Sequence, residues 1–121
     1  AVIVLDQFSR NLFRGDPRAY GSDPIARRLA KQAIDAGYDQ ALPPRQRLFF
    51  YLPFEHSEHA GHQAMAVELI GSLGNAGWTR YAQLHKDLID KFGRFPGRNV
   101  ALGRQSTPAE VAALQGPNAS F

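Results

Sequence analysis

Hydrophobic positions in this chain recur every three to four residues, and glycine or proline separates one such stretch from the next. That period is typical of amphipathic helices, and no convincing alternating strand pattern appears. The first stretch predicts a largely buried helix over residues 1–14. A second helix is predicted to begin at Asp23, a capping residue followed by Pro24 at the first helical position, and to end at Gly37. The positions expected to be buried in this second helix are Ile25, Leu29, Ala33 and Ile34, with the small residues Ala26 and Ala30 beside them.

The second half of the chain repeats this punctuation. After a loop at 38–43, a short helix is expected from Pro44, and Pro53 is expected to break or kink it. Longer helices are predicted over about 57–73 and from after Gly77 to Phe92, and Gly93 is expected to end the latter. The positions expected to face inward in this last helix are Tyr81, Leu84, Leu88 and Ile89.

The C-terminal quarter contains a loop and one more helix. Residues 93–106 form a loop rich in glycine and arginine. The run Thr107-Pro108-Ala109-Glu110 matches a capping box, which begins a short helix. Residues 116–121 are expected to fray. We therefore predict one all-α domain over residues 1–121, built from antiparallel helix pairs stacked on one another.

Composition narrows the class further. The 121 residues include 44% hydrophobic residues, which is enough for a core. The net charge is +3, and Arg outnumbers Lys by 11 to 3, which favours carboxylate or phosphate partners or reflects only a compositional bias. The absence of Cys excludes disulfides and thiolate metal sites, and it fits a reducing, cytoplasmic location. No apolar run is long enough to span a membrane.

The N-terminal sequence is unusual for a complete chain. It begins Ala-Val-Ile-Val-Leu, without an initiating Met, a basic leader or a cleavage site. This start is typical of the middle of an apolar helix. We therefore expect the chain to be a fragment that lacks its N-terminal helices.

Two clusters of arginine and asparagine, near the two ends, are candidates for a binding site. The first contains Arg10, Asn11 and Arg14, on a helix that also carries a wide apolar surface. Some of these polar groups must lie at the edge of the core, where they need partners. Either they form a salt-bridge network that fixes the following loop, or they form a binding face.

The second cluster lies in the loop after residue 91. No acid occurs between Lys91 and Ala109, and the candidate ligand-binding residues there are Arg94, Arg98, Asn99 and Arg104. Guanidinium forks on an ordered Gly/Pro loop suit an anion. The alternative is that these basic residues pair with Asp6, Asp16 or Glu55 within the fold.

The segment from Glu55 to His62 carries three His and two Glu. On a helix, Glu55, His59 and His62 would share a face and could hold a divalent metal, although no established metal motif is present. Glu55 and His56 are the candidates for acid–base catalysis. The default interpretation is a polar helix start without metal or cofactor. His85, on an apolar face, is interpreted as a hydrogen-bonded core residue.

Three motifs, in order, resemble one known family: Leu5–Gly15, Leu52–Glu58, and Phe92–Asn99 together with Leu102–Arg104. The resemblance is to an uncharacterised bacterial family, domain of unknown function 924, and it covers about residues 1–113. It implies an all-α, tetratricopeptide-like fold and no assigned activity. It also implies an apolar, Trp-rich segment upstream that this chain lacks. The family motif includes Glu55 and His56 but neither His59 nor His62, which weakens the metal hypothesis and suggests that the motifs converge on one concave face.

Three functions are compatible with these patterns. The first is a helical binding module whose Arg/Asn-rich cleft holds an acidic peptide or a small anion. The second is a hydrolase- or lyase-like enzyme that uses Glu55 and His56 as acid and base, with an anionic substrate held by arginine. The third is RNA binding through the basic loop 91–104, with stacking on Phe92 and Phe95, although a net charge of +3 makes nucleic acid a poor partner.

Overall fold

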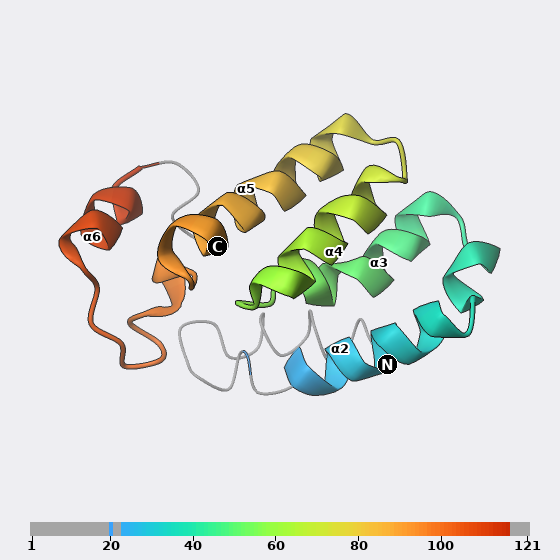
Figure 1. The fold of residues 1–121 in the computed structure, drawn as a ribbon, viewed down its shortest axis with the longest axis horizontal. Coiled ribbons are helices and arrows are strands. Elements are labelled where there is room, and N and C mark those ends of the chain that lie inside the picture. Colours follow the sequence, from blue (N-terminus) through green and yellow to red (C-terminus); the bar gives the residue numbers. More distant parts are fainter. Residues whose placement is uncertain (1–19, 21–22, 117–121) are drawn as a thin grey trace.

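Residue 20 and residues 23–116 are described by the computed structural model, and these residues are helical with loops between the helices (Figure 1). The helices are α2 (Asp23–Asp35), η3 (Tyr38–Ala41), α3 (Pro44–Glu55), α4 (Ala60–Gly71), α5 (Ala76–Phe92), η4 (Pro96–Arg98) and α6 (Pro108–Leu114). Within this part of the chain there is no strand, so the predicted all-α fold is confirmed. The helix predicted at 1–14 and all but the first residue of the tail predicted at 116–121 lie outside the described residues.

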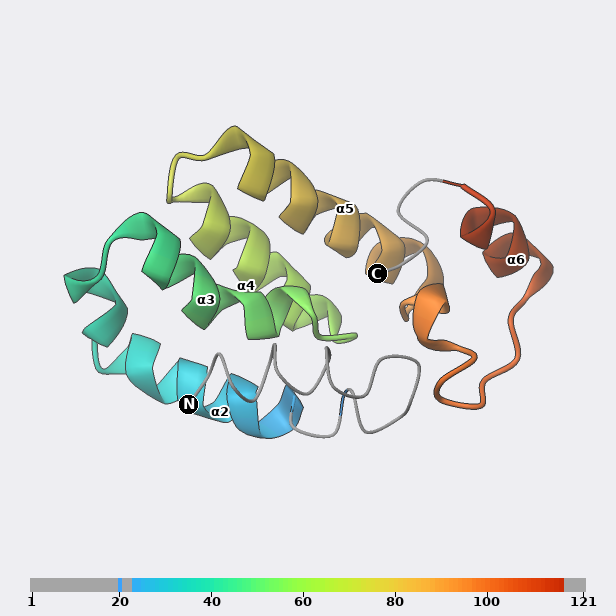
Figure 2. The same cartoon turned by 180° about the vertical axis from the view of Figure 1, so that it is seen from behind.

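Consecutive helices pack against one another, as expected for stacked helix pairs. Helix α4 lies between α3 and α5 and contacts both, and α2 packs against α3. Helix α6 stands at one end of the stack, beyond the end of α5 (Figures 1 and 2), and it contacts η4. The segment between α5 and α6 therefore lies at one end of the stack formed by α3, α4 and α5, near the carboxyl end of α3.

Small side chains let the helices approach closely at the centre of the core. Ala30 of α2, Ala66 of α4 and Ala82 of α5 are fully buried together with the large side chains of Tyr51 and Phe54 from α3. Burying such aromatic side chains supplies much of the stability of a domain of this size. No helix in the described part of the chain is both long and apolar enough to cross a membrane.

The predicted helix ends are largely confirmed. Gly93 follows α5 with φ of 74°, a left-handed conformation that glycine adopts without strain, and its N–H bonds to Ile89 O. The predicted capping box at α6 is present: Thr107 Oγ1 accepts from Glu110 N, and a Glu110 carboxylate oxygen accepts from Thr107 N. Gly37 ends α2 in the same left-handed region as Gly93.

Two predicted core positions are wrong. Ile25 is 44% exposed, because α2 faces the core with Ala26 and Ala30, one turn apart, and Ile25 lies to one side of that stripe. Tyr81 is 55% exposed for the same reason, since the buried stripe of α5 contains Ala82 and its successors at helical spacing. In both helices the prediction placed a large apolar side chain in the core, whereas the structure buries small alanine side chains, which let the helices approach more closely.

Three predicted boundaries also differ from the structure. The 38–43 loop contains the helical turn η3. Pro53 does not end α3, because it lies in the last turn, and the helix continues to Glu55 with His56 N bonded to Leu52 O. Helix α4 begins at Ala60 rather than near Ser57, since His59 caps it by accepting a hydrogen bond from Gly61 N.

Candidate functional site

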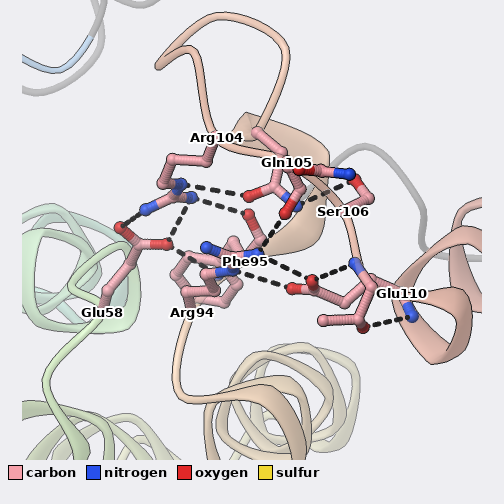
Figure 3. Close-up of polar contacts among 9 residues, drawn as sticks. Glu58, Arg94, Phe95, Arg104, Gln105, Ser106 and Glu110 are labelled. Carbon is pink, nitrogen blue, oxygen red and sulfur yellow. Dashed lines mark hydrogen bonds and ion pairs between the residues drawn. The ribbon is translucent and has the colours of Figure 1, made fainter.

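A carboxylate at the α3–α4 junction holds the loop that follows α5. Arg104 Nη1 and Nη2 donate to the two oxygens of Glu58 at 2.9 and 3.0 Å, and Phe95 N donates to Glu58 at 2.6 Å (Figure 3). Burial raises the pKa of Glu58, but the hydrogen bonds from Arg104 and Phe95 N outweigh it and keep the pKa below its ordinary value. Glu58 therefore connects two points of the 93–106 loop to the end of the helix stack.

A second bidentate pair connects the loop to α6. Arg94 Nε and Nη2 donate to the carboxylate of Glu110 at 2.8 and 2.7 Å, and Nη2 also donates to Gln105 O at 2.8 Å (Figure 3). Glu110 is 2% exposed. The guanidinium of Arg94 and the backbone N–H of Thr107 lower the pKa of Glu110 to about 2. The same carboxylate thus completes the capping box of α6 and pairs with Arg94.

This depressed pKa predicts how stability varies with pH. A lowered native pKa stabilises the fold above the ordinary value of 4.5, and the contribution is lost as the pH falls through about 2. Wild type should therefore unfold at a higher temperature than Glu110→Gln at pH 7, and the difference should shrink to nothing near pH 2. Thermal unfolding followed by circular dichroism at several pH values measures it. Glu68→Gln, which changes an exposed carboxylate, is the control and should match wild type throughout; a Glu110→Gln deficit independent of pH would contradict the assignment.

Asn99 and Arg104 complete this bracing network. Asn99 is buried, its Nδ2 donates to Ser106 Oγ at 3.0 Å, and its Oδ1 accepts from Arg104 Nε at 3.0 Å. Three of the predicted ligand-binding residues, Arg94, Asn99 and Arg104, therefore bond to other parts of the chain. The acids that they contact are Glu58 and Glu110, not the predicted Glu55, and Asp6 and Asp16 lie outside the described residues. We call Glu58, Arg94, Asn99, Arg104 and Glu110 the brace.

An open depression of about 590 Å³ adjoins the brace, between the end of α5 and the start of α6. Its lining includes Lys91 and Phe92 together with Arg94 and Glu110. The guanidinium that an anion would need there is already bonded to a carboxylate, so the depression gains little affinity for anions from Arg94.

Arg98 connects the loop to the end of α3. Its Nη2 donates to the backbone oxygen of His56 at 2.6 Å. Its guanidinium carbon lies 4.4 Å from the ring centroid of Tyr20 and 4.7 Å from that of Phe95, so two aromatic rings flank it. Arg98 therefore brings a buried positive charge to the end of α3.

At that end of α3, three chemically active side chains converge. Glu55 is the last residue of α3, His56 follows it, and His85 projects from the buried face of α5. Each offers one ligand atom, and these atoms all lie within 4.8 Å of one another. Glu55 Oε2 is 3.7 Å from His56 Nε2. We call Glu55, His56 and His85 the polar centre.

The structure arranges the other histidines elsewhere. His59 caps α4, and the Nδ1 atom of His62 lies 2.7 Å from Ser57 Oγ. The two imidazole rings are 4.7 Å apart, yet the described residues bring Glu55 together with His56 and His85 rather than with this pair. Arg10, Asn11 and Arg14 lie outside the described residues. The motifs were expected to converge on one concave face. Among the described residues, Arg98 does contact His56, which lies beside Glu55. Arg94 and Asn99 belong to the brace instead.

His85 is the residue of the polar centre that sequence reasoning missed. It is a buried, hydrogen-bonded histidine, as predicted, and its Nδ1 lies 2.7 Å from Tyr81 O. Nothing in its own surroundings along the chain distinguishes it from a core residue. The only available signal was its position on the buried stripe of a helix that had to pack near the carboxyl end of α3.

Comparisons with known proteins agree with the fold. A family model described as bacterial protein of unknown function (DUF924) matches residues 1–118. The solved structure of a protein of unknown function from Agrobacterium tumefaciens is similar to this chain, at 44% sequence identity and a TM-score of 0.91. That similarity covers 95% of this chain and 65% of the other, so the chain spans 65% of the length of that relative. No curated protein matches the chain significantly. The resemblance drawn from the motifs is confirmed: the chain belongs to the bacterial family of proteins of unknown function DUF924.

Proposed function

We propose that this domain is a helical binding module for a small anion, and that the anion is held at the polar centre beside Arg98. The observation that carries the proposal is the convergence of Glu55, His56 and His85 from α3 and α5 within 4.8 Å. Arg98 adds a guanidinium that is held in position by two aromatic rings and by the backbone oxygen of His56. Imidazole and guanidinium N–H groups suit carboxylate and phosphate oxygens.

Two other arginines of the loop are poorly suited to an anion. Arg94 and Arg104 each make two hydrogen bonds to a carboxylate, so an anion that bound there would have to displace an internal ion pair. An acidic peptide, which needs an extended row of positive groups, is less well suited to this loop than a small anion. The lack of cysteine remains compatible with a reducing compartment such as the cytoplasm.

A thermal-shift screen tests the proposal. Phosphorylated metabolites, dicarboxylates and acidic peptides are added one class at a time, both with and without a chelator. We expect a small-anion class to raise the melting temperature of wild type, and His56→Ala to lose that shift while melting within a few degrees of wild type. The control, Lys91→Ala, removes an exposed positive charge near the brace and should keep the shift. A shift that survives in His56→Ala but is lost in Lys91→Ala would place the ligand at the loop instead.

An acid–base enzyme is the second candidate at the same centre. Its support is the 3.7 Å separation of Glu55 Oε2 and His56 Nε2, an arrangement that could move a proton to and from a bound anionic substrate. Turnover of the identified anion that is abolished in Glu55→Gln, with binding retained, would favour catalysis. Binding of the anion without any turnover would exclude the enzyme and favour the binding module.

RNA binding through the loop is not supported by the positions of its aromatic residues. Phe95 is fully buried, so its ring is not available to stack on a base. Phe92 is half-buried, and the Lys91 ammonium lies 5.2 Å from its ring centroid. Two of the loop's basic side chains are engaged with Glu58 and Glu110, so these two add little to the attraction of a polyanion.

A further inference from the structure

We infer that Glu55, His56 and His85 bind a divalent transition metal ion of the zinc class. This inference deepens the proposed function, because it rests on the same polar centre and names an ion that would hold the anion there. The three ligand atoms lie within 4.8 Å of one another. An ion with bonds of about 2 Å keeps its ligands no more than about 4 Å apart, so small side-chain rotations would complete the site.

The ligand types agree with this class of metal. Two imidazoles and one carboxylate are the protein ligands of several mononuclear zinc and iron sites. Magnesium and calcium prefer sites made of oxygen atoms alone, so they should bind poorly here. The set also differs from a surface cluster of acids, because Glu55 is 4% exposed and His85 is 6% exposed.

The imidazole of His85 is oriented for metal binding. Its Nδ1 is 2.7 Å from the backbone oxygen of Tyr81. A carbonyl oxygen can only accept a hydrogen bond, so Nδ1 carries the proton and the neutral ring has its lone pair on Nε2. Metal-binding histidines usually donate their second ring N–H to a carbonyl or carboxylate in this way, which fixes the tautomer and the ring orientation.

The backbone that carries the other two ligands is also held in place. Gln63 is fully buried in α4, and its Nε2 donates to the backbone oxygens of Glu55 and Ser57, both at 2.6 Å. Arg98 donates to the backbone oxygen of His56. These bonds are made to carbonyl groups of the last residue of α3 and of the two residues after it, where the intrahelical partners of a helix run out. They also limit the movement of the two adjacent ligands, and such support strengthens a metal site.

Metal binding would connect the polar centre to the proposed anion. Three protein ligands leave at least one coordination position open to water or to another ligand. A doubly charged ion with one carboxylate keeps a net positive charge, and Arg98 adds a guanidinium that donates to the backbone oxygen of His56. A small carboxylate or phosphate is the ligand that such a centre would recognise.

The test is titration of the intact protein with Zn²⁺ by calorimetry and with Co²⁺ by visible absorption, without added anion. Wild type should bind one equivalent of either ion, and Co²⁺ should give the absorption of a nitrogen- and oxygen-ligated site. His85→Asn keeps a donor near Tyr81 O but removes Nε2, and it should weaken binding at least about tenfold. Glu55→Gln, which keeps the side-chain shape, should weaken binding similarly, and it provides the test if His85→Asn does not fold.

His59→Asn is the matched control. It removes an exposed imidazole that lies beside His62 and could bind metal adventitiously, while asparagine can still cap α4. The control should bind Zn²⁺ as wild type does. Binding that is lost in His59→Asn and kept in His85→Asn would overturn the inference. The absence of Zn²⁺ and Co²⁺ binding in wild type would also overturn it. If small anions still raised the melting temperature with chelator present, only the metal would be excluded, and the proposed function would remain.

Discussion

Phe95→Ala is expected to lower the free energy of unfolding by about 3–5 kcal/mol, the range for removing a fully buried phenylalanine. The ring of Phe95 packs edge-on against His85, with centroids 5.6 Å apart, and it also flanks the guanidinium of Arg98. The cavity would therefore open beside the polar centre. Urea denaturation followed by circular dichroism measures the loss.

The control for Phe95→Ala lies in the same loop. Val100 is 91% exposed, so Val100→Ala should change the free energy of unfolding by no more than about 0.5 kcal/mol. We also expect Phe95→Ala to weaken anion or metal binding, because His85 and Arg98 lose a common neighbour. A Phe95→Ala protein as stable as wild type would show that the loop does not pack against α5 as described.

The ion pair of Glu58 and Arg104 should give the second largest effect. Glu58→Ala leaves the Arg104 guanidinium and Phe95 N without their acceptor, and Arg104→Ala removes two hydrogen bonds from the Glu58 carboxylate. Each single alanine variant should therefore lose about 1.5–3 kcal/mol of the free energy of unfolding. In a double-mutant cycle, the double variant should lose less than the sum of the two single losses, because both remove the same interaction. The coupling free energy is measured by urea denaturation of the four proteins.

The Lys86–Asp90 pair is the matched comparison. It is also an ion pair, with Nζ 2.6 Å from Oδ2, but it lies one turn apart on the outer part of α5. Its coupling should be about 0.3–0.5 kcal/mol, the usual value for helix-surface pairs. Equal couplings for the two pairs would mean that Glu58 and Arg104 form an ordinary surface contact, not a brace.

Much of the fold was predictable because it depends on local rules. Gly93 and the capping box at Thr107 predicted their helix ends correctly, since their effect comes from the conformation and hydrogen bonds of a few neighbouring residues. Ile25 and Tyr81 were assigned wrongly because hydrophobicity alone does not say which stripe of a helix meets its neighbour. In this molecule the close approach of the helices selects alanine for the buried faces.

The candidate site was harder to predict, because its residues are distant in sequence. Glu58 and Arg104 are separated by 46 positions, and Arg98 and His56 by 42. A sequence shows that a basic loop needs partners, but it does not show which acid lies opposite which arginine. His85 was interpreted as a core residue on local grounds, and its neighbours in the polar centre come from another helix. The metal set Glu55, His59 and His62 assumed one continuous helix, but α3 ends at Glu55 and α4 begins at Ala60.

The four histidines allow a direct test of the claim that ligand binding occurs at the polar centre. Two of them, His56 and His85, belong to the centre, while His59 and His62 lie outside it. The measurement is the imidazole nitrogen resonances of the intact protein, followed by NMR as inorganic phosphate is added. The account predicts that the resonances of His56 and His85 move together with one affinity and that those of His59 and His62 stay in place. Movement of His59 and His62 alone, or no movement at any histidine, would contradict it.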